Sequence, residues 1–202
     1  MDKYGRGPVG WDRERSNSGM EFTETGYTTY CKRPGYFNSA IGRLAMRAGK
    51  RYRFTLRVKK RSLHGLFQVG ICLPQNLENA SFAASSKGWA FYPCWSGCKV
   101  NNGVMLQYGK SLSRTGLIDV EVDLVEGALS FALNGEALGP AFRIPVDQPM
   151  YPAFATSDPG ITCSFLVDYW RERRIFLFLS RRTKSLKKIP QSLLREIVTL
   201  IA

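Results

Sequence analysis

Cysteine and histidine are the first candidates for chemistry in this sequence. Cys94 and Cys98 are separated by three residues, and His64 is the only histidine in the chain. A redox-active cysteine pair has two intervening residues, and a structural zinc site takes four ligands, usually from two close pairs. The sequence therefore favours structural thiols in an aromatic loop, and it predicts no bound metal and no cofactor. His64 is expected at an ordinary turn near a strand.

Acidic residues recur at every second position from Asp119 to Asp123. Paired carboxylates can cleave glycosidic bonds when they face each other across a cleft. Here Asp119, Glu121 and Asp123 alternate with apolar residues, so all three lie on one face of a predicted strand and are expected to be solvated. Opposite charges across neighbouring strands are mildly favourable, so we expect a basic strand face beside them, formed by Arg51, Arg53, Arg57 and Lys59. The sequence predicts no enzymatic activity.

Positive charge is the unusual feature of the composition. The chain has 29 Lys and Arg against 16 Asp and Glu, a net charge of +13, and nine of the basic residues lie in 171–202. That tail could attract a nucleic acid, an anionic membrane or an acidic protein, and charge alone does not choose among them. The apolar run at 175–179 is far shorter than the roughly 18 residues of a membrane span.

The N-terminus and the cysteines predict the compartment. Residues 1–10 have no apolar run, so no secretory signal is expected there. The chain has five cysteines, an odd number, and reduced thiols are the default for a protein that is not exported. We expect an intracellular protein, cytoplasmic or nuclear.

The elements that would position these residues are mostly β-strands. Residues 50–59 alternate between apolar and basic side chains, with the period of two that marks a half-buried strand. Residues 66–73 and 118–124 also show apolar faces, and Asn134-Gly135 is a strong signal for a two-residue hairpin. Short strands separated by Gly and Pro turns favour an antiparallel sandwich or barrel.

Three segments follow from these patterns. Residues 1–20 are predicted as an N-terminal arm that Trp11 and Met20 could attach to the body, residues 21–170 as the β domain, and residues 171–202 as a basic tail. The tail is expected to contain an amphipathic helix, because large aliphatic residues recur there at spacings of three and four. These residues are Leu186, Ile189, Leu193, Leu194, Ile197, Val198 and Ile201.

Aromatic residues are expected both in the core and at the surface. Phe131 is predicted at the centre of the sandwich, and Trp89 and Phe91 are predicted to be packed. Tyr92 and Trp95 are better candidates for exposure. Aromatic rings at the rim of a domain often become binding hot spots.

The order of the motifs resembles the SPRY domain family. Residues 120–142 contain a VEVDL strand, an LSF strand, an NG hairpin and an LGPAF stretch in the order of that family. A glycine-led strand at 49–58, a VG pair at 69–70, a KGW turn at 87–89 and a YPAF strand at 151–154 also match in order. The resemblance covers about residues 11–170. It implies a concanavalin-like sandwich of two antiparallel sheets, whose loops bind short peptide segments of partner proteins.

The resemblance predicts a non-catalytic protein–protein interaction module. Its peptide surface would be built from loops after an early strand, after the VG strand and before the last strand. The aromatic rings would supply apolar contacts, two basic residues would favour an acidic peptide, and Asn and Asp would exchange hydrogen bonds. The predicted partner-binding residues are Lys32, Arg33, Tyr36, Asn76, Tyr92, Trp95, Ser157 and Asp158.

The tail offers a second resemblance and leaves alternatives open. Some SPRY proteins carry a SOCS box that recruits a ubiquitin ligase, and the stretch from Leu186 to Ile197 is similar to its ending; an F-box-like interpretation is equally good. The chain would then be a substrate-recognition adaptor whose tail contacts a ligase subunit. The alternatives are a lectin-like, carbohydrate-binding sandwich, because one fold hosts several functions, or nucleic-acid association through the tail. The tail residues expected to interact are Leu186, Ile189, Leu193, Leu194 and Ile197.

Overall fold

The computed structural model describes residues 10–61, 65–77 and 80–166. Within them the chain forms fourteen strands and one short 3-10 helix, η1. The elements are β1 (Trp11–Asp12), β2 (Met20–Phe22), β3 (Thr28–Cys31), β4 (Asn38–Gly42), β5 (Arg51–Lys60), β6 (Phe67–Cys72), η1 (Phe82–Ala84), β7 (Gly88–Tyr92), β8 (Cys98–Asn101), β9 (Val104–Gln107), β10 (Thr115–Asp123), β11 (Ala128–Leu133), β12 (Glu136–Arg143), β13 (Tyr151–Thr156) and β14 (Ile161–Phe165).

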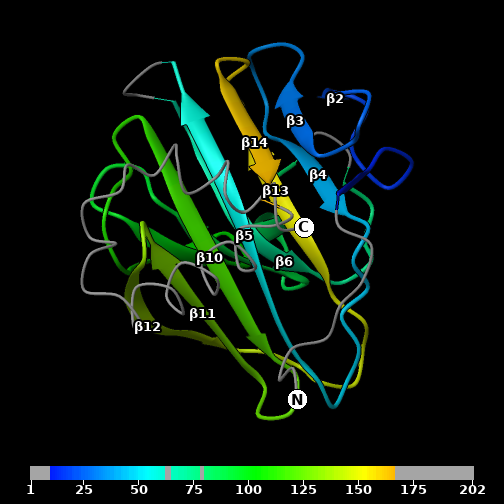
Figure 1. Ribbon diagram of the computed structural model, residues 1–202, viewed down its shortest axis with the longest axis vertical. Coiled ribbons are helices and arrows are strands. Elements are labelled where there is room, and N and C mark those ends of the chain that lie inside the picture. The colour runs from blue at the N-terminus through cyan, green and yellow to red at the C-terminus, as the bar shows by residue number, and fades with distance from the viewer. Residues whose placement is uncertain (1–9, 62–64, 78–79, 167–202) are drawn as a thin grey trace, which may run out of the picture. The chain divides into compact units, whose positions relative to one another are not determined.

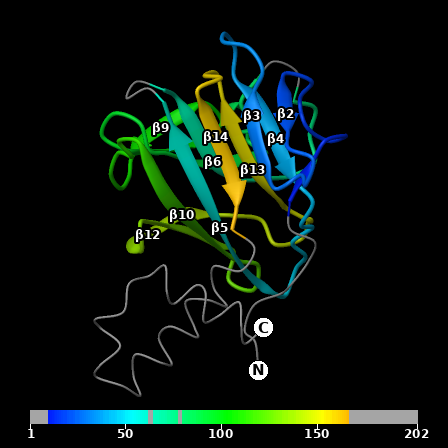
Figure 2. The same cartoon turned by 45° about the horizontal axis from the view of Figure 1, so that its top comes forward.

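The strands form two antiparallel sheets of seven strands each. One sheet has the order β12-β11-β10-β5-β14-β3-β2, and the other has the order β1-β4-β13-β6-β7-β8-β9. In Figure 1 β10, β5 and β14 of the first sheet lie in front of β6 and β13 of the second, and Figure 2 shows the same strands with the top of the molecule turned forward. The predicted all-β sandwich is confirmed.

The period of two fixes which face of β5 points inward. Tyr52, Phe54, Leu56 and Val58 are all buried, whereas the arginines between them are partly exposed. The neighbouring strand β10 follows the same rule, and its Val120 lies opposite Phe54 in the ladder. Because directly opposed residues share a face, the apolar sides of the two strands meet in the core.

Two hairpins follow from Asn-Gly pairs. Asn134 and Gly135 join β11 to β12 with φ values of 54° and 87°, and Asn102 and Gly103 join β8 to β9 with φ values of 51° and 72°. A two-residue turn with positive φ at both positions matches the twist of the flanking strands, and Asn and Gly tolerate that conformation best. The predicted hairpin at 134–135 is confirmed.

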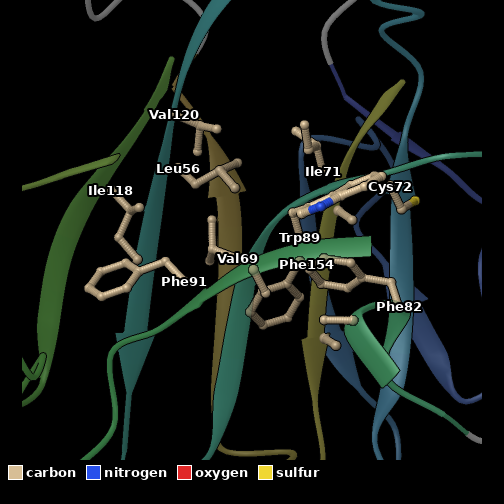
Figure 3. Close-up of a cluster of buried hydrophobic side chains, with 14 of the residues drawn as sticks. Leu56, Val69, Ile71, Cys72, Phe82, Trp89, Phe91, Ile118, Val120 and Phe154 are labelled. Carbon is tan, nitrogen blue, oxygen red and sulfur yellow. The ribbon is translucent and has the colours of Figure 1, made fainter. Parts of the chain in front are cut away.

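The core lies between the two sheets. Phe91 from one sheet and Phe131 from the other have ring centroids 5.6 Å apart, and both residues are buried. Figure 3 shows Phe91 beside Ile118, with Leu56, Val69 and Phe154 close by. The predicted burial of Phe131, Trp89 and Phe91 is confirmed.

The N-terminal segment contributes two residues to this core. Trp11 and Met20 are 1% and 5% exposed, and the indole Nε1 of Trp11 donates a hydrogen bond to the carbonyl of Cys163 at 3.3 Å. Trp11 lies in β1, which pairs with β4, and Met20 lies in β2, which pairs with β3. The predicted boundary at residue 20 stays a prediction.

The C-terminal prediction falls outside the described residues. The chain divides into one compact unit that ends at Phe165 and a second that begins at Leu166. The predicted boundary at residue 170 and the predicted helix at Leu186–Ile201 therefore stay predictions. Within the part that the structure describes, no helix is long and apolar enough to cross a membrane.

Candidate protein-interaction surface

The loops that carry Tyr36, Trp95 and Asp158 lie at one end of the sandwich. Asn38 pairs with Thr156, so the loop before β4 adjoins the turn after β13. The Cys94 thiol donates to the carbonyl of Gly65 at 3.5 Å, which brings the loop after β7 to the start of β6. We call this surface the loop end and define it by residues 32–37, 65–66, 93–97 and 157–160.

The loop between β3 and β4 presents a basic and aromatic tip. Lys32, Arg33 and Tyr36 are exposed, and Tyr36 has 79% of its surface accessible. The backbone beneath the tip is fixed, because Asn38 Nδ2 donates to the carbonyl of Tyr36 at 3.0 Å and the Cys31 thiol donates to the carbonyl of Arg33 at 2.9 Å. The side chains therefore project from a held backbone.

Lys32 forms an ion pair with Glu21 at the base of this loop. Its Nζ lies 3.3 Å from Glu21 Oε1, and the hydroxyl of Tyr30 donates to Glu21 Oε2 at 2.6 Å. The hydrogen bond from Tyr30, together with the ammonium of Lys32, lowers the pKa of Glu21. This carboxylate stays ionised and offsets part of the positive charge of the tip.

The loop between β7 and β8 holds Trp95 outward. Trp95 is 68% exposed and its φ is 53°, a left-handed conformation that costs a bulky residue about 1–2 kcal/mol. The adjoining Gly97 has a φ of 85°, and a Cβ there would lie 2.7 Å from the backbone of Lys110. The strained turn is thus locked by close backbone contact, as is common at ligand-binding sites.

The predicted exposure of Tyr92 is wrong. Tyr92 is 3% exposed, and burial raises the pKa of its phenol. It belongs to β7, whose five residues are all buried, and η1 packs against this strand. The ring of Tyr92 instead contacts the ring of Trp95, with centroids 5.5 Å apart.

The turn between β13 and β14 has a half-buried carboxylate. Asp158 Oδ1 accepts a hydrogen bond from the backbone N–H of Gly160 at 2.7 Å, and the N–H of Asp158 donates to Thr156 Oγ1 at 3.1 Å. Thr156 Oγ1 in turn donates to the carbonyl of Leu66 at 2.8 Å. Asp158 therefore shapes the loop end, and Ser157 beside it is also half-buried.

Asn76 does not join the other predicted residues. Because β6 begins at the loop end and ends at Cys72, the residues that follow it lie at the opposite end of the strand. Asn76 is exposed and lines a separate cavity of about 650 Å³ together with Arg15 and Tyr151. The guanidinium of Arg15 lies 4.8 Å from the centre of the Tyr151 ring in this cavity. Burial raises the pKa of Cys72, which also lines it, to about 12.

Two acidic residues of β10 lie opposite Arg51 and Arg53 of β5, as expected, whereas Arg57 and Lys59 lie opposite Leu117 and Thr115. Arg51 Nε lies 2.6 Å from Asp123 Oδ2, and Arg53 Nη1 lies 2.8 Å from Glu121 Oε1. The expectation that Asp119 is also solvated is wrong, since it is 2% exposed. The register places Asp119 opposite Thr55, whose hydroxyl donates to Asp119 Oδ1 at 2.6 Å.

Side chains of the types that bind metals are dispersed through the described residues. No cluster of three or more His, Cys, Asp or Glu side chains is placed to bind an ion there. All five cysteines are free thiols, and four of them are buried. Burial raises the pKa of Cys163 and of Cys94, which keeps these thiols protonated and unreactive.

The family follows from a match over more than half of the chain. The sequence profile of the SPRY domain matches residues 51–168. The chain belongs to the SPRY domain family. No match was found among curated proteins.

Solved structures with the same fold include other SPRY domains. The SPRY domain of human HERC1 has a TM-score of 0.63 and 21% identity, with 77% of this chain and 96% of that chain covered. The TRIM65 PSpry domain has a TM-score of 0.61 and 18% identity, with 78% and 91% covered. Stonustoxin has a TM-score of 0.58 and 16% identity, with 78% of this chain but 27% of that chain covered. At these identities the likeness shows the fold alone.

The sequence did not point to a further exposed apolar segment of this SPRY domain. Val104, Met105 and Leu106 of β9 are 57%, 50% and 56% exposed. Three consecutive apolar residues do not alternate with polar ones, so the pattern does not indicate which of them are exposed. The Asn-Gly turn at 102–103 does indicate a hairpin. Whether that hairpin lies at the end of a sheet depends on the strand order, which the turn does not determine.

Proposed function

We propose that this SPRY domain binds an extended segment of a partner protein at the loop end, with Trp95 and Tyr36 as apolar anchors. The observation that carries the proposal is the exposed Trp95 ring on a strained, locked backbone. A large aromatic side chain held rigidly in solvent loses little conformational entropy on binding, and such residues dominate interface energies. Membership of the family supports an interaction module as the general class of function.

The partner segment is proposed to carry acidic residues. Lys32 and Arg33 flank the tip beside Tyr36, and both are exposed. Glu21 offsets part of the Lys32 charge, so Arg33 is expected to make the stronger contact with a carboxylate. Rim charges of this kind mainly speed association and select among partners.

Affinity capture with the full chain tests this surface. A double variant, Trp95→Ala with Tyr36→Ala, should lose one or more captured proteins that the unmodified chain retains. The matched control is Val125→Ala with Val146→Ala, which removes two exposed apolar side chains outside the loop end. Equal capture by both double variants, with melting temperatures unchanged, would refute the proposal.

A finer proposal assigns the tail to recruitment of a ubiquitin ligase. Its support is the sequence pattern from Leu186 to Ile197, which lies outside the described residues. Truncation after Trp170 should abolish co-capture of ligase subunits and leave proteins bound at the loop end in place. Retention of ligase subunits by the truncated chain would contradict it. No observation among the described residues favours the carbohydrate alternative, and it is not proposed.

A further inference from the structure

Strand β9 ends one of the two sheets and is exposed along its whole length. Its neighbour on one side is β8, and it has no strand neighbour on the other side within the described residues. All four residues from Val104 to Gln107 are exposed, and the first three are apolar. An open sheet edge with apolar side chains is a template for pairing with another strand.

The other three sheet edges carry features that discourage pairing. β1 has two residues and β2 has three, too few for a stable ladder. β12 is longer, but its pairing with β11 is interrupted by register shifts, and it contains Gly139 with a φ of 82° and then Pro140. Short edges, bulges and prolines are the usual protections of an edge strand. β9 has no proline, no charged residue and no register shift.

The hydrogen-bonding pattern between β8 and β9, here called the phase of the ladder, determines which backbone N–H and C=O groups of β9 face the open edge. A two-residue hairpin closes on a hydrogen-bonded pair, here Asn101 with Val104, and such pairs alternate along an antiparallel ladder. The hydrogen bond from Tyr108 N–H to the Gly97 carbonyl at 3.1 Å continues the same phase. The N–H and C=O groups of Met105 and Gln107 therefore point away from β8, toward the open edge.

This phase makes the edge complementary to itself. We propose that β9 pairs antiparallel with β9 of a second copy of the chain, about a two-fold axis that passes beside Leu106. Met105 of one copy then exchanges two hydrogen bonds with Gln107 of the other, and the symmetry repeats them. Leu106 meets the Leu106 of the second copy as a non-hydrogen-bonded pair, in which opposed side chains lie closest. The interface is isologous and closed.

The charges near β9 are compatible with a second copy. Like charges directly opposite each other destabilise a ladder, and the residues from Val104 to Gln107 carry none. Lys110 Nζ lies 2.7 Å from Glu136 Oε1, and Lys99 Nζ donates to the carbonyl of Ala141 at 2.6 Å. Both ammonium groups are thus directed at β12 of their own chain. A second copy also supplies an uncharged edge of equal length and matching phase.

Two four-residue strands bury little surface, so the dimer should be weak and should depend on concentration. Sedimentation equilibrium of the full chain should show a mass that rises with concentration from 22.8 kDa toward twice that value. Leu106→Lys places like charges on the axis and should hold the mass at that of the monomer. Val125→Lys is the matched control, because Val125 is 52% exposed and lies in the β10–β11 turn, and it should behave like the unmodified chain.

Cysteine substitution tests the register. Under oxidised glutathione Leu106→Cys should form a covalent dimer, because opposed residues on the axis fall within the Cα separation of a disulfide. Val104→Cys is equally exposed, but the two Val104 positions would be separated by about 14 Å along the strands and should not cross-link. The unmodified chain controls for its own thiols.

The proposal is overturned if the unmodified chain is monomeric at every concentration measured. It is also overturned if Leu106→Lys dimerises as strongly as the unmodified chain, or if the two cysteine variants cross-link equally. The Leu106 variants should still capture partners at the loop end. Failure here is therefore distinguishable from failure of the proposed function.

Discussion

The ring of Trp95 meets the ring of Tyr92 edge-on, with centroids 5.5 Å apart and planes at 87°. Trp95 is exposed, and Tyr92, three residues earlier, is buried. Trp95 lies beyond the end of β7, and its backbone is in the left-handed conformation. The pair thus joins the proposed binding surface to the core.

Backbone strain at Trp95 can be measured by comparing two variants that both remove the indole. Trp95→Gly should be more stable than Trp95→Ala by about 1 kcal/mol, because glycine adopts a positive φ at little cost. Both variants lose the contact with Tyr92, so the difference isolates the backbone. Urea denaturation measures it. An alanine variant more stable than the glycine variant would mean that the turn holds no strain, because alanine loses less backbone entropy on folding.

Phe131 tests the core and the register of β11. Phe131→Ala should lower the free energy of unfolding by about 3–5 kcal/mol, because it leaves a cavity between the two sheets beside Phe91. The measurement is denaturant unfolding of the full chain. A loss below about 1 kcal/mol, the size of an ordinary surface effect, would contradict the burial of this ring.

Asp119 and Glu121 lie on the same face of β10 but should respond differently to substitution. Asp119→Ala removes a 2% exposed carboxylate that accepts a hydrogen bond from Thr55, and we expect a loss of about 3 kcal/mol. Glu121→Ala removes a side chain that is 42% exposed, and it should cost less than about 1 kcal/mol. Equal losses in chemical denaturation would show that Asp119 is solvated after all.

Acid should remove the stabilisation that Asp123 supplies. Burial tends to raise the pKa of this carboxyl, but hydrogen bonds from the N–H groups of Glu126 and Val125 and from Arg51 outweigh it, so the pKa lies below 3.8. A group with a lowered pKa in the folded state stabilises above its unfolded pKa and loses that effect as pH falls through its folded pKa. The window is therefore below about pH 4.

The matching measurement is urea unfolding of the unmodified chain and of Asp123→Asn from pH 7 down to pH 3. The variant should be less stable at neutral pH, and the gap should narrow below about pH 4. Glu126→Gln serves as a control for loss of a nearby charge. A gap that stays constant across this range would exclude the lowered pKa as its cause.

The sequence by itself determined the local elements of this protein. The period of two at 50–59 and at 118–124 fixed the buried faces of β5 and β10, because successive side chains of a strand point to opposite sides. Asn134-Gly135 fixed a hairpin, because few other residue pairs tolerate its dihedral angles. The ordered motifs also pointed to the SPRY family, which the profile match confirms.

Only the tertiary structure decided which of these local features meet. Asn76 lies far from the other predicted residues because β6 runs from the loop end to the opposite end of the sandwich. Asp119 is buried, and the β5–β10 register places it opposite Thr55. Val104, Met105 and Leu106 are exposed on β9, although Trp11 on β1, at the other end of the same sheet, is buried. Strand order and register are set by pairing between residues distant in sequence, and a period of two carries no information about which strand lies at an edge.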